Sequence, residues 1–135
     1  MDAITTYLNF DGNCREAMTF YQTCLGADLR LMTFAEAPPE MPCPPSDLIL
    51  HATITKGSLV LMASDAMSGM PLIKGNNASL SINCHSVEEI DKLFVAFGEG
   101  GKVLMPLGAT FWAARFGMLT DQFGINWMFN LEQGK

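Results

Sequence analysis

The sequence predicts an α+β fold that consists of two tandem β-α-β-β-β modules. Three observations support this prediction. The same order of strand-like and helix-like segments occurs twice, about 73 residues apart when counted from Asn13 to Ser86. Each helix-like segment opens with a pattern that is typical of a capping box. A hairpin pattern lies near the end of the second copy, and repetition of this kind indicates paired supersecondary units.

The first copy begins with a strand-like segment at residues 4–10, where polar and apolar residues alternate. Asn13 and Glu16 then have the spacing of a capping box, and Gly26 is suited to end the helix that they open. Three more strands are expected at residues 28–34, 48–56 and 58–63. The Pro-rich stretch 37–46 between the first two of these strands is expected to form a surface loop.

The second copy begins with a strand-like segment at residues 78–85. Ser86 and Glu89 form the second capping-box pattern, and Gly98, Gly100 and Gly101 are expected to end the helix. For His85, which directly precedes Ser86, a role in supporting the cap is expected rather than catalysis. Three more strands are expected at residues 102–107, 115–120 and 125–131.

Asp121 and Gly124 predict a hairpin between the last two strands, because Asp bonds to its own backbone and Gly readily adopts a positive φ. Asp121 is therefore interpreted as a turn residue rather than a catalytic acid. In the last strand, the two-residue period separates a core face from a polar, uncharged face. The expected core set is Ile125, Trp127, Phe129 and Leu131, and the other set is Asn126, Met128 and Asn130.

A chain of 135 residues is expected to form a single domain, with module one at about 1–65, a linker at about 66–77 and module two at about 78–131. The composition is 49% hydrophobic and 16% charged, which favours a packed core over disorder. No apolar run reaches the roughly 20 residues of a membrane-spanning helix, and the N-terminal residues lack the basic region of a signal peptide. We therefore expect a cytoplasmic protein without a membrane partner.

The charge pattern also limits the range of partners. With a formal net charge of −6 and scattered Lys and Arg residues, the chain has no basic stripe for a phosphate backbone. Nucleic acid is therefore not an expected partner. The four cysteines include no C-x-x-C pair, so disulfides and a cysteine-held zinc ion are not expected.

Several short motifs are shared with one known group of proteins. They are residues 7–13 (YLNFDGN), 51–52 (HA), 61–65 (LMASD), 110–112 (TFW), 114–117 (ARFG), 120–124 (TDQFG) and Trp127. On these motifs the chain resembles the vicinal oxygen chelate superfamily, which includes glyoxalase I, extradiol dioxygenases and bleomycin and fosfomycin resistance proteins. Within it, the chain is most similar to the PhnB-like subfamily, some of whose members are named 3-demethylubiquinone-9 3-methyltransferases.

The resemblance implies that each module curls into a half-barrel and that the paired half-barrels face each other around a cleft. Metal-dependent relatives hold a divalent ion in this cleft with His and Glu side chains from the first and fourth strands of each module. The corresponding positions here are Thr6, Leu61, Ser79 and Met128. None of them carries an imidazole or a carboxylate.

This ligand set is unsuited to a divalent metal. An uncompensated ion in a low-dielectric site costs on the order of tens of kcal/mol by the Born estimate. We therefore expect no metal at the usual positions and predict no cofactor. A site for S-adenosylmethionine is not expected either, because the glycines at 98–101 follow a helix and precede a strand, which reverses the order of nucleotide-binding loops.

The candidates for ligand contact come from both modules. His51 is suited to bind a substrate or act as a base, or else to be a hydrogen-bonded core histidine. Trp112 and Arg115 are suited to a carboxylate or phosphonate ligand, because Arg offers a fork of donors and an aromatic ring can stack. The same two residues would equally suit a contact between subunits. From their places in the implied fold, the remaining ligand-binding candidates are Thr6, Ser79 and Met128.

Three functions remain open from the sequence, and no catalytic residue is assigned. The first is a protein that binds a small molecule in the cleft without the family's metal. The second is a lyase, isomerase or dioxygenase whose metal has non-standard ligands, such as His51 with Asp65 or Asp121. The third is a non-catalytic structural or interaction dimer. A homodimer is expected because pairing would cover strand edges and an apolar helix flank.

Overall fold

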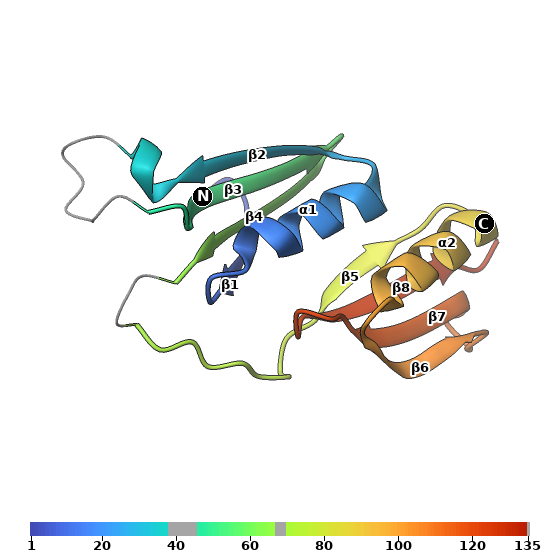
Figure 1. Ribbon diagram of the computed structural model, residues 1–135. Helices are drawn as coiled ribbons and strands as arrows, with labels where there is room; N and C mark the ends of the chain where they lie inside the picture. Colours follow the sequence, from blue (N-terminus) through green and yellow to red (C-terminus); the bar gives the residue numbers. More distant parts are fainter. Residues whose placement is uncertain (38–45, 67–69, 135) are drawn as a thin grey trace. The chain divides into compact units, whose positions relative to one another are not determined.

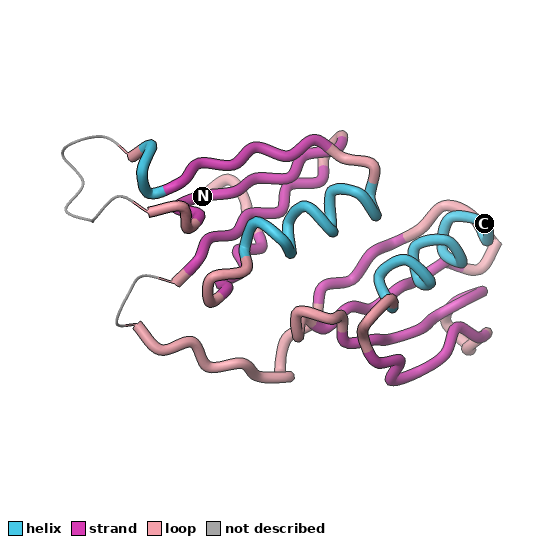
Figure 2. The backbone as a smooth tube through the Cα atoms, viewed as in Figure 1, coloured by secondary structure: helices cyan, strands magenta, loops and turns pink. Residues whose placement is uncertain are grey.

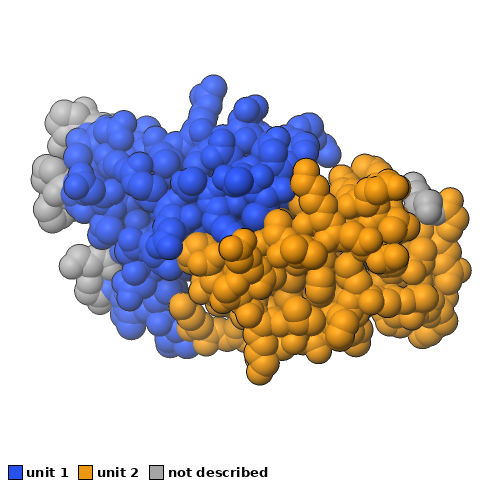
Figure 3. Space-filling view, turned by 45° about the vertical axis from the view of Figure 1, so that its right-hand side comes forward, with its two compact units in different colours: residues 1–73 blue, residues 74–135 orange. Residues whose placement is uncertain are grey.

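Both predicted modules form a four-stranded sheet with one long helix (Figure 1). The structure is a computed structural model that describes residues 1–37, 46–66 and 70–134. The chain divides into two compact units, Met1–Ile73 and Lys74–Lys135, which are coloured separately in Figure 3. Their boundary lies within the segment 66–77 that the sequence analysis assigns to a linker. Each unit is described by itself below.

In the first unit, the strands of the sheet are in the order β1-β4-β3-β2. The elements are β1 (Thr6–Phe10), α1 (Cys14–Leu25), β2 (Asp28–Thr33), the short 3-10 helix η1 (Phe34–Glu36), β3 (Ile49–Lys56) and β4 (Leu59–Asp65). β1 runs parallel to β4, and the other neighbouring strands are antiparallel. The helix α1 contacts β2, β3 and β4 and lies along one face of the sheet (Figure 1).

The second unit repeats this arrangement with the strand order β5-β8-β7-β6. The elements are β5 (Leu80–Asn83), α2 (Val87–Gly98), β6 (Lys102–Gly108), β7 (Ala113–Thr120) and β8 (Asn126–Glu132). β5 runs parallel to β8, while β6 with β7 and β7 with β8 are antiparallel. The helix α2 contacts β6, β7 and β8. Figure 2 shows the long helix and the strands of each unit, and in the first unit also the short helix η1.

The predicted α+β class and the order of elements in both modules are confirmed. The differences concern the ends of strands. The strand expected at 78–85 is shorter and forms only Leu80–Asn83. Residues 34–36 form η1 instead of continuing β2, because the Glu36 carboxylate accepts hydrogen bonds from the backbone N–H and the hydroxyl of Thr33 at 3.1 and 2.9 Å. Most of the predicted surface loop 37–46 lies outside the described residues.

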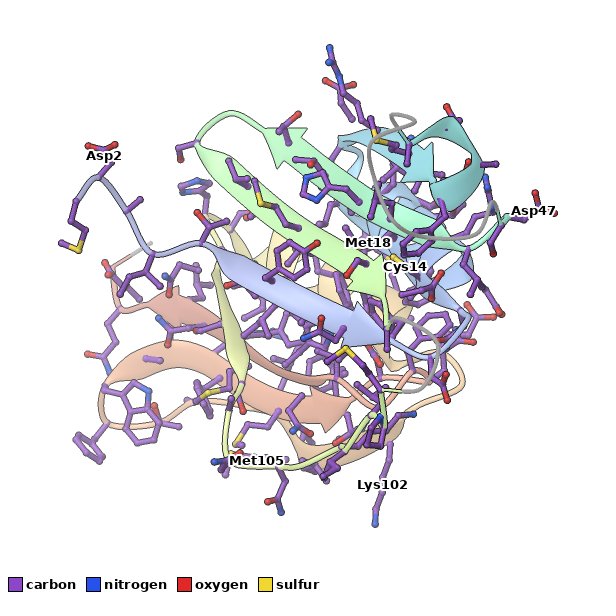
Figure 4. The ribbon with its side chains drawn as sticks, turned by 90° about the vertical axis from the view of Figure 1, so that its left-hand side faces the viewer. Asp2, Cys14, Met18, Asp47, Lys102 and Met105 are labelled. Atoms are coloured by element: carbon purple, nitrogen blue, oxygen red, sulfur yellow. The ribbon has the colours of Figure 1, made fainter. Side chains whose placement is uncertain are left out.

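Each helix covers a buried core on one face of its sheet. In the first unit the buried side chains include Cys14, Ala17, Met18 and Tyr21 of α1 and Ala52, Ile54, Leu61 and Ala63 of the strands. Cys14 and Met18 are labelled in Figure 4. In the second unit they include Ile90, Leu93 and Phe97 of α2 and Leu119, Trp127, Phe129 and Leu131 of the strands. The last three were predicted, whereas Ile125, the fourth residue of the predicted core set, is half-buried and precedes β8. We call the opposite face of each sheet its helix-free face.

The N-terminus of α1 is held differently from the sequence prediction. The Asn13 side chain makes no capping hydrogen bond, so the predicted box of Asn13 and Glu16 is wrong. Instead, Oδ1 of Asp65 accepts the N–H of Cys14 at 2.9 Å, and Oδ2 accepts the N–H of Ile49 at 2.8 Å. Asp65 is only 3% exposed, so a buried carboxylate joins the start of α1, the start of β3 and the end of β4.

The caps and turns of the second unit follow the sequence more closely. Ser86 Oγ accepts the N–H of Glu89 at 3.1 Å, and Glu89 Oε1 accepts the N–H of His85 at 2.7 Å, so His85 supports the cap as expected. Asp121 Oδ1 accepts the N–H groups of Phe123 and Ile125 at 2.8 and 3.0 Å, which confirms its role in the turn. Neither helix in the described part of the chain has the length and hydropathy that are needed to cross a membrane.

Candidate functional site

The helix-free face of the first sheet carries a row of side chains that can contact a ligand. One set of register partners crosses the sheet from β1 to β2, and its members are Tyr7, Met62, Thr53 and Arg30. Register partners share one face of a sheet, and successive residues of a strand alternate between the faces. Because Ile54 is buried beneath α1, its neighbour Thr53 and the whole row lie on the side opposite the helix.

His51 lies beside this row and is contacted at both ring nitrogens. The Tyr7 hydroxyl lies 3.3 Å from Nδ1, and Oγ1 of Thr53 lies 3.0 Å from Nε2. The rings of Tyr7 and His51 are tilted by 34°, with centroids 5.9 Å apart. Since His51 alternates with the buried Ala52 and is itself half-buried, its imidazole belongs to the helix-free face. Residues from β1 and β3 together hold the ring in place.

The trio of Tyr7, His51 and Thr53 has hydrogen-bonding capacity left for a ligand. A neutral imidazole has one N–H and one lone pair, so one hydroxyl accepts from the ring and the other donates to it. The accepting hydroxyl keeps its own O–H, and the donating hydroxyl keeps its lone pairs. Whichever tautomer is present, the trio therefore offers a ligand at least one donor and one acceptor.

Arg30 adds a positive charge next to the trio. It is the register partner of Thr53, and Cβ atoms of such partners lie about 4.5–5.5 Å apart. The Arg30 side chain is exposed. Within residues 1–37, 46–66 and 70–134, its guanidinium group makes no ion pair and no hydrogen bond. All five of its N–H donors are therefore available to a ligand.

Arg115, a candidate from the sequence, belongs to the second sheet. It lies on the face that α2 covers, not on the helix-free face, and it already has an acidic partner. Its Nη1 donates to Oδ1 of Asp91 in α2, and both side chains are partly exposed. Strand alternation places Arg115 on the same face as Gly117, where an added Cβ would meet the Phe94 ring of α2 at 2.7 Å. Arg115 is thus directed towards α2 and joins this helix to β7.

Trp112 lies in the turn between β6 and β7, at an exposed aromatic corner. Its ring packs edge-on against Phe111 and Phe116, with centroids 4.8 and 5.4 Å away. The turn is stabilised by Thr110, whose Oγ1 accepts the N–H of Ala113 at 3.0 Å. Trp112 remains 49% exposed, which leaves one side of the indole available for a ligand or another protein surface.

The four positions that correspond to the family's metal ligands do not provide a metal site. Thr6 is an exposed residue at the start of β1, and its register partner Leu61 is buried in the core beneath α1. Ser79 immediately precedes β5, whereas Met128 pairs with Ser81 rather than with Ser79. A divalent metal ion in a protein is typically bound by imidazoles, carboxylates or thiolates. These four positions provide two hydroxyls, one aliphatic side chain and one thioether, so they do not fit a divalent metal ion.

The carboxylates that were considered as non-standard ligands are engaged elsewhere. Both oxygens of Asp65 accept backbone N–H groups, as described above. Asp121 uses Oδ1 for the turn, and its Oδ2 accepts the indole N–H of Trp127 at 2.8 Å. Asp65 also lies on the core face of β4, while His51 lies on the helix-free face. In the described ranges, three or more His, Cys, Asp or Glu side chains do not gather at any one point.

Sequence reasoning identified His51 but missed Tyr7, Thr53 and Arg30 as members of its surroundings. Thr53 could have been found, because it lies two residues after His51 and alternation places both side chains on one face. Tyr7 and Arg30 could not, since their positions depend on the pairing of β1 with β4 and of β2 with β3. No local pattern reports that register.

Comparisons with known proteins place the chain in one family. The family model for 3-demethylubiquinone-9 3-methyltransferase matches residues 2–129. Protein YjdN of Escherichia coli (strain K12) is 36% identical over 140 residues, which cover 95% of this chain and 94% of that protein.

Solved structures agree with this assignment. Protein PA1353 from Pseudomonas aeruginosa is 45% identical, with a TM-score of 0.88 and coverage of 98% of each chain. A putative 3-demethylubiquinone-9 3-methyltransferase, PhnB protein, from Bacillus cereus is 30% identical, with a TM-score of 0.78 and coverage of 96% of this chain and 99% of that one. A glyoxalase/bleomycin resistance protein/dioxygenase family enzyme from Burkholderia phytofirmans PsJN, 16% identical over 96% of this chain and 99% of its own, shares the fold with a TM-score of 0.67.

Proposed function

Because the chain belongs to the 3-demethylubiquinone-9 3-methyltransferase-like family, the PhnB-like branch of the glyoxalase/bleomycin resistance proteins, we propose that it binds a small polar molecule. The proposed site is the helix-free face of the first sheet. The observation that carries the proposal is the trio, in which Tyr7 and Thr53 hold both nitrogens of His51. An imidazole that two different strands fix in this way is pre-organised for recognition.

The proposed ligand contacts combine polar and apolar groups. The two hydroxyls of the trio supply a donor and an acceptor, while Met62 lies between Tyr7 and Thr53 in the same row. A thioether side chain is apolar and adaptable, so it can pack against ligands of different shapes. This mixture of a few placed polar groups with an apolar surface is typical of small-molecule sites.

We propose that binding proceeds without the divalent metal of metal-dependent relatives. Support comes from the side-chain chemistry at Thr6, Leu61, Ser79 and Met128 and from the engaged oxygens of Asp65. The test is metal analysis of untagged protein after incubation with Ni, Zn, Mn and Fe. We expect no stoichiometric retention of any of the four metals, and ligand binding that is insensitive to a chelator. Stoichiometric metal that a chelator removes together with ligand binding would refute this part of the proposal.

The binding proposal can be tested on the histidine rings directly. The chain contains two histidines, so a spectrum of imidazole nitrogens from untagged protein has two sets of signals, from His51 and His85. Acetate, pyruvate, sulfate, inorganic phosphate, glycerol and glucose would be titrated in turn. We expect at least one of them to shift the His51 signals to saturation while leaving those of His85 unchanged.

Two matched variants locate the site. His51→Ala removes the ring that links the two hydroxyls and should weaken binding by roughly tenfold or more, because hydrogen bonds in the site are lost. His85→Ala removes the other imidazole. The bond of residue 85 to the cap of α2 comes from its backbone N–H, which alanine keeps, so the affinity should be unchanged. Equal affinities of wild type and His51→Ala would show that the ligand binds elsewhere.

We also propose that the chain forms a homodimer through the edge of its second sheet. β6 is an edge strand with exposed Val103, Leu104 and Met105, of which Met105 is labelled in Figure 4. The adjoining turn exposes Phe111 at 90% and Trp112 at 49%. An edge strand with apolar side chains favours pairing with another chain.

Light scattering at micromolar concentration tests the dimer. We expect wild type to be a dimer and Leu104→Lys to be a monomer, because a charge at the paired edge would be buried without a partner. Val95→Lys is the matched control, since Val95 is an exposed apolar residue that lies on the helix α2 and not on the edge strand β6. A monomeric wild type would refute the proposal.

A further inference from the structure

We infer that the ligand is a small oxyanion, with a carboxylate or a phosphate-type group, that Arg30 and the hydroxyls of Tyr7 and Thr53 hold together, and that protonation of His51 strengthens its binding. The inference rests on the proposed function, because it assigns a ligand class to the same face of the first sheet. Three features of this face support it: an unpaired guanidinium, two hydroxyls whose donor capacity depends on the ring, and a small number of opposing charges.

The first feature is the state of Arg30 compared with that of Arg115. Arg115 is neutralised by Asp91, so its guanidinium is already committed to a carboxylate. In the described part of the chain Arg30 has no such partner, although it is held beside Thr53 by the register of β2 with β3. A guanidinium presents donors in a planar fork that matches the two oxygens of a carboxylate or a phosphate. The free fork therefore selects an oxyanion over a neutral ligand.

The second feature is the bond pattern of the trio. When the His51 ring is neutral, one of the two hydroxyls must donate to it, so only the other hydroxyl has an O–H for the ligand. When the ring is protonated, both of its nitrogens donate. Tyr7 and Thr53 then both accept from the ring, and both of their O–H groups become available. Protonation thus adds a second outward donor and a positive charge, and both changes favour an anion.

The third feature is the charge around the trio. On the helix-free face, the strands bring one carboxylate, Asp28, which lies on β2 two residues before Arg30 and pairs with Thr55. The neighbouring positions on β1 and β4 are uncharged, namely Asn9, Val60, Met62 and Ser64. Arg30, Tyr7 and Asp28 are therefore the titratable or charged groups on the described strands that share this face with His51. An anion at the trio meets more positive than negative charge once His51 is protonated.

The test uses sulfate and acetate as probes, with chloride at matched ionic strength as the reference. Sulfate keeps its charge between about pH 6 and about pH 8, the range in which histidine typically changes charge. We expect both anions to shift the His51 ring signals at about pH 6. We expect binding of sulfate to weaken by roughly tenfold when the pH rises to about 8, because one charge-assisted donor is lost.

Two pairs of variants assign the effect to residues. Arg30→Ala should weaken sulfate binding by roughly tenfold or more, whereas Arg15→Ala removes the same charge from α1, on the other side of the sheet, and should have little effect. His51→Gln keeps a donor and an acceptor between the hydroxyls but cannot be protonated, so its sulfate affinity should no longer depend on pH. His85→Gln should retain the pH dependence of wild type.

The outcomes separate this inference from the proposed function. If glycerol or glucose shifts the His51 signals and neither anion does, the oxyanion assignment is wrong and the binding site remains. If no probe shifts these signals, both are wrong. Equal losses in Arg30→Ala and Arg15→Ala would reduce the effect to overall charge and overturn the inference. Sulfate binding of equal strength at both pH values would overturn the role of His51 protonation. A selective loss in Arg30→Ala together with a pH dependence that His51→Gln removes would support it.

Discussion

Replacing Asp65 with alanine should destabilise the first unit strongly. The Asp65 carboxylate is 3% exposed, and its two oxygens accept the backbone N–H groups of Cys14 and Ile49 at 2.9 and 2.8 Å. Alanine would leave both N–H groups buried without an acceptor. Hydrogen bonds to a charged group contribute about 1.5–3 kcal/mol each, so the free energy of unfolding should fall by about 3–6 kcal/mol. Asp65→Asn keeps one acceptor oxygen, and its loss should be about half as large, roughly 1.5–3 kcal/mol.

Urea denaturation followed by circular dichroism would measure this loss. Amide hydrogen exchange at Cys14 and Ile49 would locate it, because these two N–H groups should lose protection first. Asp11→Ala is the matched control, since Asp11 is an exposed carboxylate between β1 and α1 and should change stability by no more than about 0.5 kcal/mol. The reasoning is refuted if Asp65→Ala is as stable as Asp11→Ala. A variant of full stability that has lost bound metal would instead make Asp65 a metal ligand.

Three other predictions, on Gly101, Arg115 and Cys14, test separate parts of the fold. Gly101→Ala places a Cβ against the carbonyl oxygen of Thr120 and 3.0 Å from Cα of Asp121, so it should cost about 1–3 kcal/mol in thermal or urea unfolding. Gly108→Ala, with nothing within 4 Å, is its neutral control. Arg115→Ala breaks a partly exposed ion pair and should change stability by less than about 1 kcal/mol while sulfate binding stays as in wild type; a weaker affinity would return Arg115 to the site. Burial, with a smaller contribution from the charge of Asp65, raises the pKa of the Cys14 thiol from 9.0 to about 12. Because the folded pKa exceeds the unfolded one, this group's contribution to stability is present below pH 9 and is lost as the pH rises through about 12. Cys14→Ala should remove part of that alkaline decline in unfolding experiments, and an unchanged decline would contradict the assignment.

The local features of the fold were predicted well because their causes lie within a few residues. Gly26 ends α1 with a φ of 62°, and Gly124 completes the β7–β8 turn with a φ of 89°. Asp121 and Ser86 bond to N–H groups two to four residues away in the chain. In each case a short pattern contains both the donor and the acceptor, so the sequence is sufficient to identify the interaction.

The cap of α1 shows where this reasoning stops. Asn13 and Glu16 have the spacing of a capping box, yet the helix is held by Asp65, 51 residues away from Cys14. A buried carboxylate with two charge-assisted bonds provides a stronger anchor than a half-buried asparagine at the N-cap. The contact exists only after β1 and β4 have paired, so no local pattern contains it.

The sequence by itself determined the α+β class, the repeated order of elements, the hairpin and the absence of imidazole or carboxylate at Thr6, Leu61, Ser79 and Met128. Only the tertiary structure decided that Tyr7, Thr53 and Arg30 surround His51 and that Arg115 is directed to Asp91. The physical reason is the two-residue period of a strand. A shift of one residue in the register moves a side chain to the opposite face, and the register is set by pairing between strands that lie far apart in the chain.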